Sequence, residues 1–508
     1  MKKNSIFLLI VMFSFLIIDF LGFKLFGYEY ITLTDPLKLT INKKIFIDFF
    51  YLFMLIVFLL FSKIRFVIII IYLLTLIDFG HFYLFKTHIM PFEWGLVGFN
   101  FYDIFNALKA NFSIVLFLIF ILLGFSWVVI KVKKDYKFFE IIGGGLLLIV
   151  FIIPNKINSF YPSNKHLTII NVLFSFDRFI YDLVVKKPLP QFEKYMYKKI
   201  DSGKPIVVLI MGESLNYKRM HLYGWDYNDT PYLDYLAKND KYFIYKKAIS
   251  YAPETTTSIS SFFYNKREPQ NLEVIKNKNL IELARENGYK VYWLSMQIDR
   301  GKLLPKFVNE ANISMIRNDF KRKYDDELIK KLKEINLSTK SFIILHFRAN
   351  HYYYEDYTPK EYYKFPFNKR QDYHTYMVNS YMNSVLYVDK LIYETIMYLK
   401  SLKKPFVFYF TSDHGEFLGF PEEKGRYLHL YLDKLDCLVP FIYYSNTYKK
   451  ELNQTFYSHY QISKMLTRDL GYRLINPNEK KDIYYINSPV FDGRGGFIKY
   501  NISRFNDE

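Results

Sequence analysis

The chain has 508 residues and a formal net charge of +19, with 68 lysine and arginine residues against 49 acidic ones. Its length allows two or three domains. The charge would suit a polyanion, but long apolar stretches in the N-terminal third argue against nucleic acid as the partner and favour a membrane protein.

Five apolar stretches come first along the chain, and each is roughly long enough to cross a hydrocarbon core of about 30 Å as a helix. They are residues 5–23, 45–61, 66–83, 113–130 and 138–153. We therefore predict a helical transmembrane domain of five spans over residues 1–155. The first stretch is long and lacks a small-residue cleavage site, so we expect a retained span and not a cleaved signal.

The orientation of this domain follows from its short basic links. Met1-Lys2-Lys3, residues 62–65 and residues 131–137 are rich in lysine and arginine, and such links stay in the cytoplasm. Five spans then place everything after about residue 155 outside the cytoplasm. We predict a multi-pass protein of a bacterial inner membrane with a periplasmic domain. Its sole cysteine, Cys437, can form no internal disulfide.

The rest of the chain divides into a short bridge and a large α/β domain. Residues 156–200 predict a bridging helix and linker, which could lie along the membrane face or pack on the following domain. From residue 201 to 508, short apolar strands alternate with helical periodicity, which indicates an α/β domain with a mostly parallel central sheet. The expected strands are 205–211, 289–295, 341–347 and 405–412, and the expected helices are 279–288 and 384–402.

Three of the four predicted strands end in polar residues. Glu213 and Ser214 follow the first, His346 and His351 mark the end of the third, and Asp413-His414 follow the fourth, with His429 further on. Parallel strands place such residues at one edge of a sheet. Glu213, Asp413 and His414 together suit a zinc-like divalent ion. Singly, each has an ordinary interpretation as a helix cap, a core histidine or a turn.

A candidate nucleophile lies in the segment "YAPETTTSISSFFY", residues 251–264. It is dense in hydroxyl groups and runs into an apolar stretch, as the start of a helix does. A threonine there could be activated by a cation and by the positive end of the helix. The alternative is an ordinary Ser/Thr-rich helix cap.

These segments together resemble the phosphoethanolamine transferases of the alkaline-phosphatase/sulfatase superfamily. The resemblance extends over the whole chain, and its motifs are "GES…YGWDYNDTPYLD", "APETTTSISSFF", "HFRANH", "NSVLYVDKLI" and "TSDHGEFLG…YLH". It implies that Glu213, Asp413 and His414 bind zinc together with the nucleophilic threonine. Thr255, three residues before Ser258-Ile259, fits the family spacing best, and Thr257 with Ser260 fits it less well.

The resemblance also implies the remaining site residues and the reaction. His351 and His429 match histidines near the phosphate, which bind substrate or a second zinc. The expected activity is transfer of phosphoethanolamine from phosphatidylethanolamine to lipid A or lipopolysaccharide, through a covalent intermediate on threonine, by a monomeric enzyme. Some members of the family cause polymyxin resistance. Many relatives have disulfides near the nucleophile, which this chain lacks.

Two alternative functions remain open from the sequence. One is a glycerol-phosphate transferase or sulfatase of the same superfamily, although sulfatases usually have Cys or Ser where Thr255 stands. The other is a non-catalytic, membrane-tethered binding protein that keeps the fold.

Overall fold

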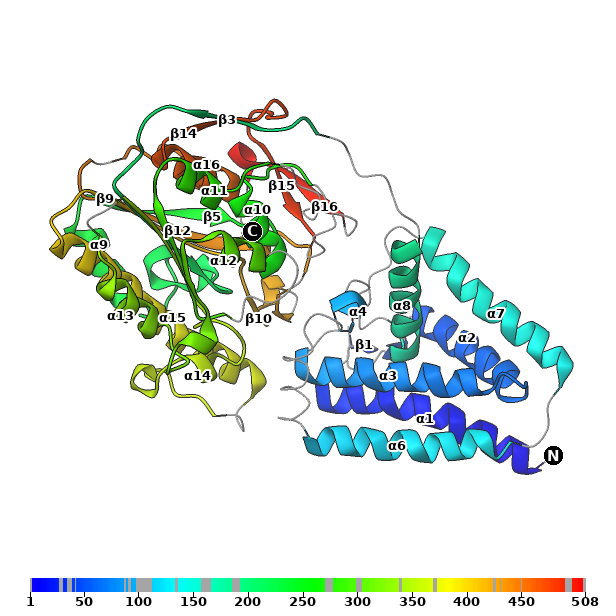
Figure 1. The fold of residues 1–508 in the computed structure, drawn as a ribbon. Helices are drawn as coiled ribbons and strands as arrows, with labels where there is room; N and C mark the ends of the chain where they lie inside the picture. The colour runs from blue at the N-terminus through cyan, green and yellow to red at the C-terminus, as the bar shows by residue number, and fades with distance from the viewer. Residues whose placement is uncertain are drawn as a thin grey trace. The chain divides into compact units, whose positions relative to one another are not determined.

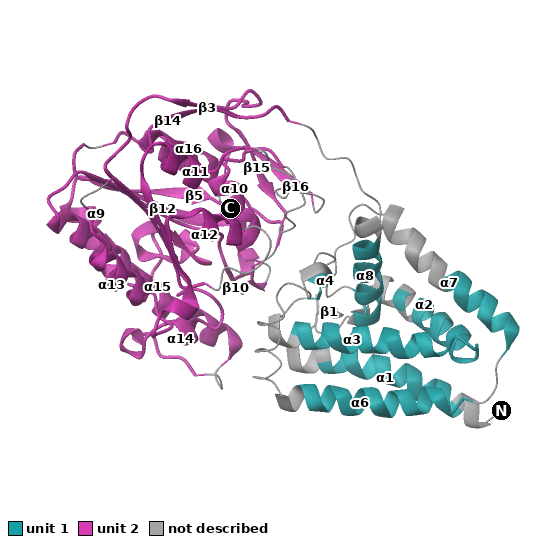
Figure 2. Ribbon diagram, viewed as in Figure 1, with its two compact units in different colours: residues 1–187 teal, residues 188–508 magenta. Residues whose placement is uncertain are grey.

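The computed structural model has two compact units, residues 1–187 and 188–508 (Figures 1 and 2). The predicted bridge of residues 156–200 lies partly outside the described residues. The structure describes residues 2–26, 31–33, 39–41, 43–85, 88–89, 93–96, 112–132, 136–156, 166–184, 192–269, 277–297, 304–337, 340–368, 372–423, 426–429, 431–448, 450–488 and 496–505.

Unit 1 is helical, and each of the five apolar stretches forms a helix. Among the residues that the structure describes, no helix combines the length and the apolar character needed to cross a membrane. The five spans therefore stay a prediction. The elements are α1 (Lys2–Phe26), β1 (Ile31–Leu33), β2 (Leu39–Ile41), α2 (Lys43–Leu60), α3 (Phe66–Phe85), α4 (Glu93–Leu96), α6 (Phe112–Ile130), α7 (Lys137–Lys156) and α8 (Thr168–Val184).

Two carboxylates fix the start of α8 within this unit. Asp48 of α2 accepts a hydrogen bond from the backbone N–H of Leu167 at 3.1 Å, and Asp19 of α1 accepts one from Thr168 at 2.9 Å. The first N–H groups of a helix have no partner inside the helix. Asp19 and Asp48 supply those partners from other helices, which fixes α8 against α1 and α2.

Unit 2 contains an eight-stranded sheet in the order β13-β5-β12-β9-β4-β8-β6-β7. All neighbouring pairs are parallel except those of β12, which runs antiparallel to both β5 and β9. The strands are β4 (Ile206–Gly212), β5 (Phe243–Ile249), β6 (Lys290–Ser295), β7 (Ile313–Met315), β8 (Ser341–His346), β9 (Phe406–Ser412), β12 (Leu438–Ser445) and β13 (Phe456–Ser458).

The central strands are mostly apolar, as a sheet covered on both faces requires. Every residue of β4, β8 and β9 is buried. Continuous apolar runs are typical of parallel strands covered on both faces. The four predicted strands are β4, β6, β8 and β9, which lie side by side in the sheet, and the predicted mostly parallel α/β domain is confirmed.

Helices and short two-stranded ribbons complete unit 2 (Figure 1). The helices are α9 (Pro231–Asn239), α10 (Thr255–Phe263), α11 (Leu280–Glu286), α12 (Leu304–Glu310), α13 (Asp326–Glu334), α14 (Tyr354–Tyr357), α15 (Tyr373–Ser401) and α16 (His459–Asp469). The ribbons pair β3 (Met196–Lys199) with β14 (Tyr472–Ile475), β10 (Phe417–Leu418) with β11 (Tyr427–Leu428), and β15 (Ile483–Asn487) with β16 (Phe497–Asn501). Short 3-10 turns occur at Tyr217–Arg219, His221–Tyr223, Arg317–Asp319, Lys360–Tyr362, Pro421–Glu423, Leu435–Cys437 and Ile502–Arg504.

Candidate metal centre

Two neighbouring parallel strands carry the candidate ligands to one edge of the sheet. In the register of β4 and β9, Gly212 lies opposite Ser412, so Glu213 and Asp413 leave the sheet side by side. The backbone N–H of Asp413 donates to the carbonyl oxygen of Gly212 at 3.0 Å, which extends the ladder to the site itself. The predicted convergence of these strand ends is therefore present in the structure.

A left-handed turn at Ser214 completes this junction. Ser214 has a φ of +52°, a conformation that is uncommon outside glycine. In this conformation its N–H donates to Asp413 Oδ1 at 3.0 Å, and its hydroxyl donates to Glu213 Oε1 at 2.9 Å. The Tyr381 hydroxyl donates to the Ser214 carbonyl oxygen at 2.8 Å. Ser214 thus links the two carboxylates and holds both in place.

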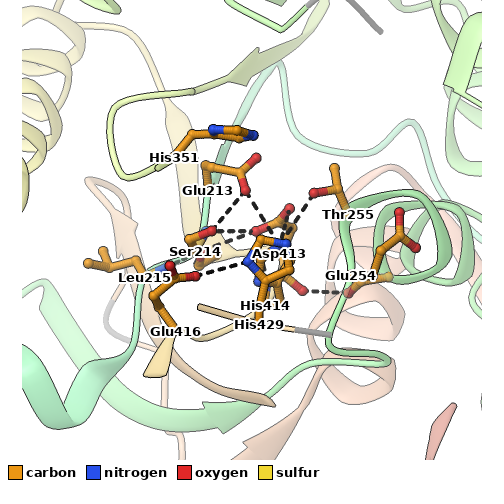
Figure 3. Close-up of polar contacts among 12 residues, drawn as sticks. Glu213, Ser214, Leu215, Glu254, Thr255, His351, Asp413, His414, Glu416 and His429 are labelled. Carbon is orange, nitrogen blue, oxygen red and sulfur yellow. Dashed lines mark hydrogen bonds and ion pairs between the residues drawn. The ribbon is translucent and has the colours of Figure 1, made fainter. Parts of the chain in front are cut away.

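Three of the four predicted ligands meet around the Nε2 atom of the fourth, His414 (Figure 3). This nitrogen lies 3.4 Å from Glu213 Oε1 and 3.4 Å from Asp413 Oδ2. It lies 3.3 Å from the hydroxyl oxygen of Thr255. Glu213, Asp413 and His414 are fully buried, and their ligand atoms lie within 4.8 Å of one another.

The other ring nitrogen of His414 is used for orientation. His414 Nδ1 lies 2.7 Å from the carbonyl oxygen of Gly415, so Nδ1 can carry the proton and leave Nε2 free to bind a metal. A side chain at Gly415 would not fit, because a Cβ atom there would lie 2.9 Å from the carbonyl oxygens of Asp436 and Leu438. The glycine therefore lets this turn pack directly against the neighbouring backbone.

The electrostatics of the site favour a bound cation. Burial raises the pKa of Asp413 above its usual value, and the nearby charge of Glu213 adds to this increase. Burial also disfavours a charged His414, but the Asp413 and Glu213 carboxylates outweigh it and raise the pKa of His414 well above its usual value. Two buried carboxylates therefore require a positive charge beside them, either a proton on the imidazole or a metal ion.

The arrangement fits zinc in both chemistry and spacing. Asp413 Oδ2 is buried and makes no hydrogen bond to any residue in the described part of the chain, so it is available as a ligand. Ligand atoms about 2.0–2.2 Å from a tetrahedral zinc lie about 3.3–3.6 Å from one another. The distances from His414 Nε2 to its three oxygen neighbours agree with this spacing.

Thr255 is the first residue of α10, as the Ser/Thr-rich segment predicts. The positive end of this helix is already occupied in part by an acidic cap. The N–H groups of Thr256 and Thr257 donate to the carboxylate of Glu254, the N-cap residue, at 2.6 and 2.9 Å. The Ser258 hydroxyl donates to the carbonyl oxygen of Asp413 at 2.5 Å, which fixes α10 against the end of β9.

The two further histidines lie beside this centre (Figure 3). The ring of His429 lies 4.2 Å from that of His414, and His429 Nδ1 lies 3.0 Å from Glu416 Oε2. The Tyr354 hydroxyl donates to the other Glu416 oxygen at 2.7 Å. Burial raises the pKa of Glu213, but the hydrogen bond and charge of His414 and the charge of His351 outweigh it, so the pKa lies below its usual value. His351 therefore lies close enough to act on Glu213.

The sequence did not identify three residues that organise the centre. Glu416 belongs to the quoted DHGE motif but received no role, although His414, Glu416 and His429 form a second possible metal group. Ser214 was noted without a function. The side chain of Gln297 contacts Glu213. Gln297 comes two residues after the predicted strand 289–295, the one strand for which the sequence prediction named no polar residue at the end. By contrast, His346 is buried with Nδ1 3.2 Å from the Ser295 hydroxyl, as a core histidine would be.

Residues 205–468, more than half of the chain, match the sulfatase family model. The chain therefore belongs to the sulfatase family. It is 25% identical over 347 residues to the phosphoethanolamine transferase EptC of Escherichia coli strain K12, a match that covers 59% of this chain and 58% of that protein. The chain thus spans little more than half the length of this relative. The match confirms the predicted resemblance to the phosphoethanolamine transferases.

Two solved structures share the fold at low sequence identity. One is the integral membrane protein lipooligosaccharide phosphoethanolamine transferase A (EptA) from Neisseria meningitidis, with a TM-score of 0.64 and 19% identity over 93% of this chain and 96% of that one. The other is the C-terminal periplasmic domain of EptC from Escherichia coli in complex with Zn, with a TM-score of 0.51 and 21% identity over 59% of this chain and 94% of that one.

Proposed function

We propose that this protein is a zinc-dependent phosphoethanolamine transferase that modifies a lipid A or lipopolysaccharide acceptor. The observation that carries the proposal is the contact of the Thr255 hydroxyl with His414 Nε2, at the point where Glu213 and Asp413 converge. A hydroxyl in this position can act as a nucleophile, and the relative EptC is itself named a phosphoethanolamine transferase.

Glu213, Asp413, His414 and Thr255 would hold the zinc ion. Zinc bound there would lower the pKa of a coordinated hydroxyl and stabilise negative charge on phosphate. Thr255 Oγ1 loses its proton and attacks the phosphorus of phosphatidylethanolamine, and the bond from phosphorus to the diacylglycerol oxygen breaks. The diacylglycerol oxygen takes up a proton as it leaves. An acceptor oxygen then loses a proton and attacks the same phosphorus, the bond to Thr255 breaks, and Thr255 Oγ1 takes up a proton again.

His351 and His429 serve the two proton transfers in this proposal. Both lie beside the candidate ligands, His351 near Glu213 and His429 against the ring of His414 (Figure 3). An imidazole there can protonate the departing diacylglycerol oxygen and later accept a proton from the acceptor. The buried Glu416 carboxylate contacts His429 Nδ1, so the other ring nitrogen, Nε2, faces away from Glu416.

The proposal places unit 1 in the bacterial inner membrane and unit 2 in the periplasm, as a monomer. Large apolar side chains are exposed on the helices of unit 1, among them Phe13, Phe120 and Ile141. Helices that are apolar on all sides are typical of membrane spans. The structural neighbour EptA is described as an integral membrane protein. A membrane anchor also suits a reaction in which the donor is a lipid.

The test is a transfer assay with labelled phosphatidylethanolamine and, in separate reactions, lipid A or lipopolysaccharide as the acceptor, using membranes that contain the full chain. Wild-type protein should move labelled phosphoethanolamine to the acceptor. Thr255→Ala should reduce transfer at least about 10³-fold, because no nucleophile remains. Thr256→Ala is the matched control and should retain most activity. Full activity in Thr255→Ala, or no product with the wild type and either acceptor, would refute the proposal.

A further inference from the structure

A buried amide from a third strand holds the candidate ligand Glu213. Gln297 lies just beyond β6, and only 8% of its surface is exposed. Its Nε2 atom donates to Glu213 Oε2 at 2.6 Å and to the carbonyl oxygen of Phe347 at 3.1 Å. Glu213 follows β4 and Phe347 follows β8, so this single amide links the ends of three adjacent strands.

The backbone of Gln297 is itself fixed in place. Its N–H donates to the Ser295 hydroxyl at 3.0 Å, and its carbonyl oxygen accepts a hydrogen bond from the N–H of Arg317 at 3.1 Å. The preceding residue, Met296, donates its N–H to the His346 carbonyl oxygen at 2.9 Å. The amide therefore extends toward Glu213 from a rigid base, and a fixed donor can determine how a carboxylate is turned.

The two oxygens of Glu213 have different surroundings. Oε2 is bound by Gln297, whereas Oε1 lies 3.4 Å from His414 Nε2 and accepts the Ser214 hydroxyl. We infer that Gln297 is a positioning residue for the zinc centre: by binding Oε2 it orients the Glu213 carboxylate so that Oε1 is presented to the metal. This inference rests on the proposed zinc-dependent function.

An amide suits this task better than a charged group. A lysine or arginine at this position would bring a positive charge next to a site meant for a cation, and an ionised carboxylate would repel Glu213. The neutral amide donates a hydrogen bond without adding charge, so Glu213 keeps its full negative charge for the metal. Removing such a partner of a metal ligand typically costs about 10–100-fold in metal affinity.

The experiment measures zinc affinity of the purified full chain by competition with a chromogenic chelator at pH 8. Gln297→Leu keeps the volume and removes the donor, and Gln297→Glu keeps the shape with an ionised group in place of the amide. We expect both variants to bind zinc about 10–100-fold more weakly than the wild type. Zinc should also raise their melting temperature by less than it raises that of the wild type.

Asn287→Leu is the matched control for loss of a buried amide. Asn287 Nδ2 donates to the carbonyl oxygens of Asp201 and Leu470 at 3.1 and 2.7 Å, and it has no bond to a candidate ligand. This control should lower the melting temperature of the metal-free protein and leave zinc affinity unchanged.

Three results would overturn the inference, and they can be told apart. If a folded Gln297→Leu protein binds zinc within twofold of the wild type, Gln297 has only a structural role. If that variant does not fold, the same affinity in Gln297→Glu leads to the same conclusion. If wild-type protein itself binds no zinc, the zinc-dependent function and the inference fall together.

Discussion

At the scale of single residues, the proposed zinc chemistry depends on how closely two carboxylates and a hydroxyl group lie to His414. Its Nε2 atom has two carboxylate oxygens and the Thr255 hydroxyl at 3.3–3.4 Å. Each of these side chains is oriented by a further hydrogen bond. The Gly415 carbonyl oxygen orients His414, and Gln297 and Ser214 orient Glu213. Glu416 orients the neighbouring His429. Such a shell of hydrogen bonds is what makes a metal site specific and tight.

Removal of one carboxylate ligand should release the metal. We expect the purified full chain to hold about one tightly bound zinc, and Glu213→Gln or Asp413→Asn to hold less than about 0.2, because an incomplete ligand set leaves the ion exposed to water. Metal content after gel filtration measures this. Glu422→Gln removes an acid that pairs with Arg219 and should retain the metal. Unchanged zinc in both ligand variants would show that the assigned ligands are wrong.

At the scale of elements, the predictable parts are those in which one local pattern determines the structure. Continuous apolar runs predicted β4, β6, β8 and β9, because burial on both faces demands them. The start and end of α11 also have local signals in the sequence. Asn279 forms a capping box at the start, and Gly288, with a φ of +79°, follows the C-cap.

Other elements carry signals that conflict with their structure. β5 contains Lys246 and Lys247 within a strand, and β12 contains Pro440, which normally argues against a central strand. The first half of α15 buries Tyr381, Asn383 and Ser384, polar residues that form hydrogen bonds to residues distant in the sequence, which local patterns do not reveal.

The same reasoning explains what was predictable in the site. Glu213, Asp413 and His414 have side chains that bind metals, and they come directly after strands, so their convergence followed from the sheet. Gln297 does not have a typical zinc-binding side chain, and its role depends on a contact with Glu213 that spans 84 residues. Glu254 was not expected to occupy the N–H groups of α10, because a Ser/Thr-rich run gives no sign of which side chain caps the helix.

One buried carboxyl group between helices should make stability depend on pH. Asp389 of α15 accepts hydrogen bonds from the N–H groups of Tyr232 and Leu233 at the start of α9, and burial raises its pKa to about 8. The folded protein keeps this proton at pH values where the unfolded chain, with a pKa of about 3.9, has lost it. Stability from this group is therefore greatest below about pH 4 and declines as the pH rises to about 8.

Asp389→Asn should remove this contribution to the pH dependence. We expect the melting temperature of the purified chain to fall less between pH 5.5 and pH 8.5 in the variant than in the wild type, because the amide does not titrate. Asp356→Asn, at a side chain that is 59% exposed, should reproduce the wild-type slope. Equal slopes for wild type and Asp389→Asn would show that Asp389 is ionised throughout this range.

At the scale of the whole molecule, a helical unit precedes a sulfatase-family unit on one chain. The lipid donor and lipid-linked acceptor that we propose are both confined to a membrane, so an enzyme joined to the proposed membrane helices would meet both without a search through solution. The net charge of +19 also favours contact with anionic glycolipids. This organisation gives the proposed reaction a physical basis beyond the chemistry of the site.

The predicted topology can be checked with reporter fusions after residue 200. An alkaline phosphatase reporter, which is active only in the periplasm, should be active there, because five spans with basic links in the cytoplasm carry residue 200 outward. A fluorescent protein that folds only in the cytoplasm should stay dark at the same position. A bright cytoplasmic reporter at residue 200 would overturn the number of spans.

The most direct test of the central claim is to map the covalent intermediate. The full chain is incubated with phosphatidylethanolamine without an acceptor, quenched in acid, digested and analysed by tandem mass spectrometry. We predict a phosphoethanolamine group on Thr255 that is lost on addition of lipid A and is absent in Glu213→Gln. A modification on Thr257 would contradict the assigned nucleophile, and an unmodified segment 251–264 in protein that is active in transfer would contradict the covalent mechanism.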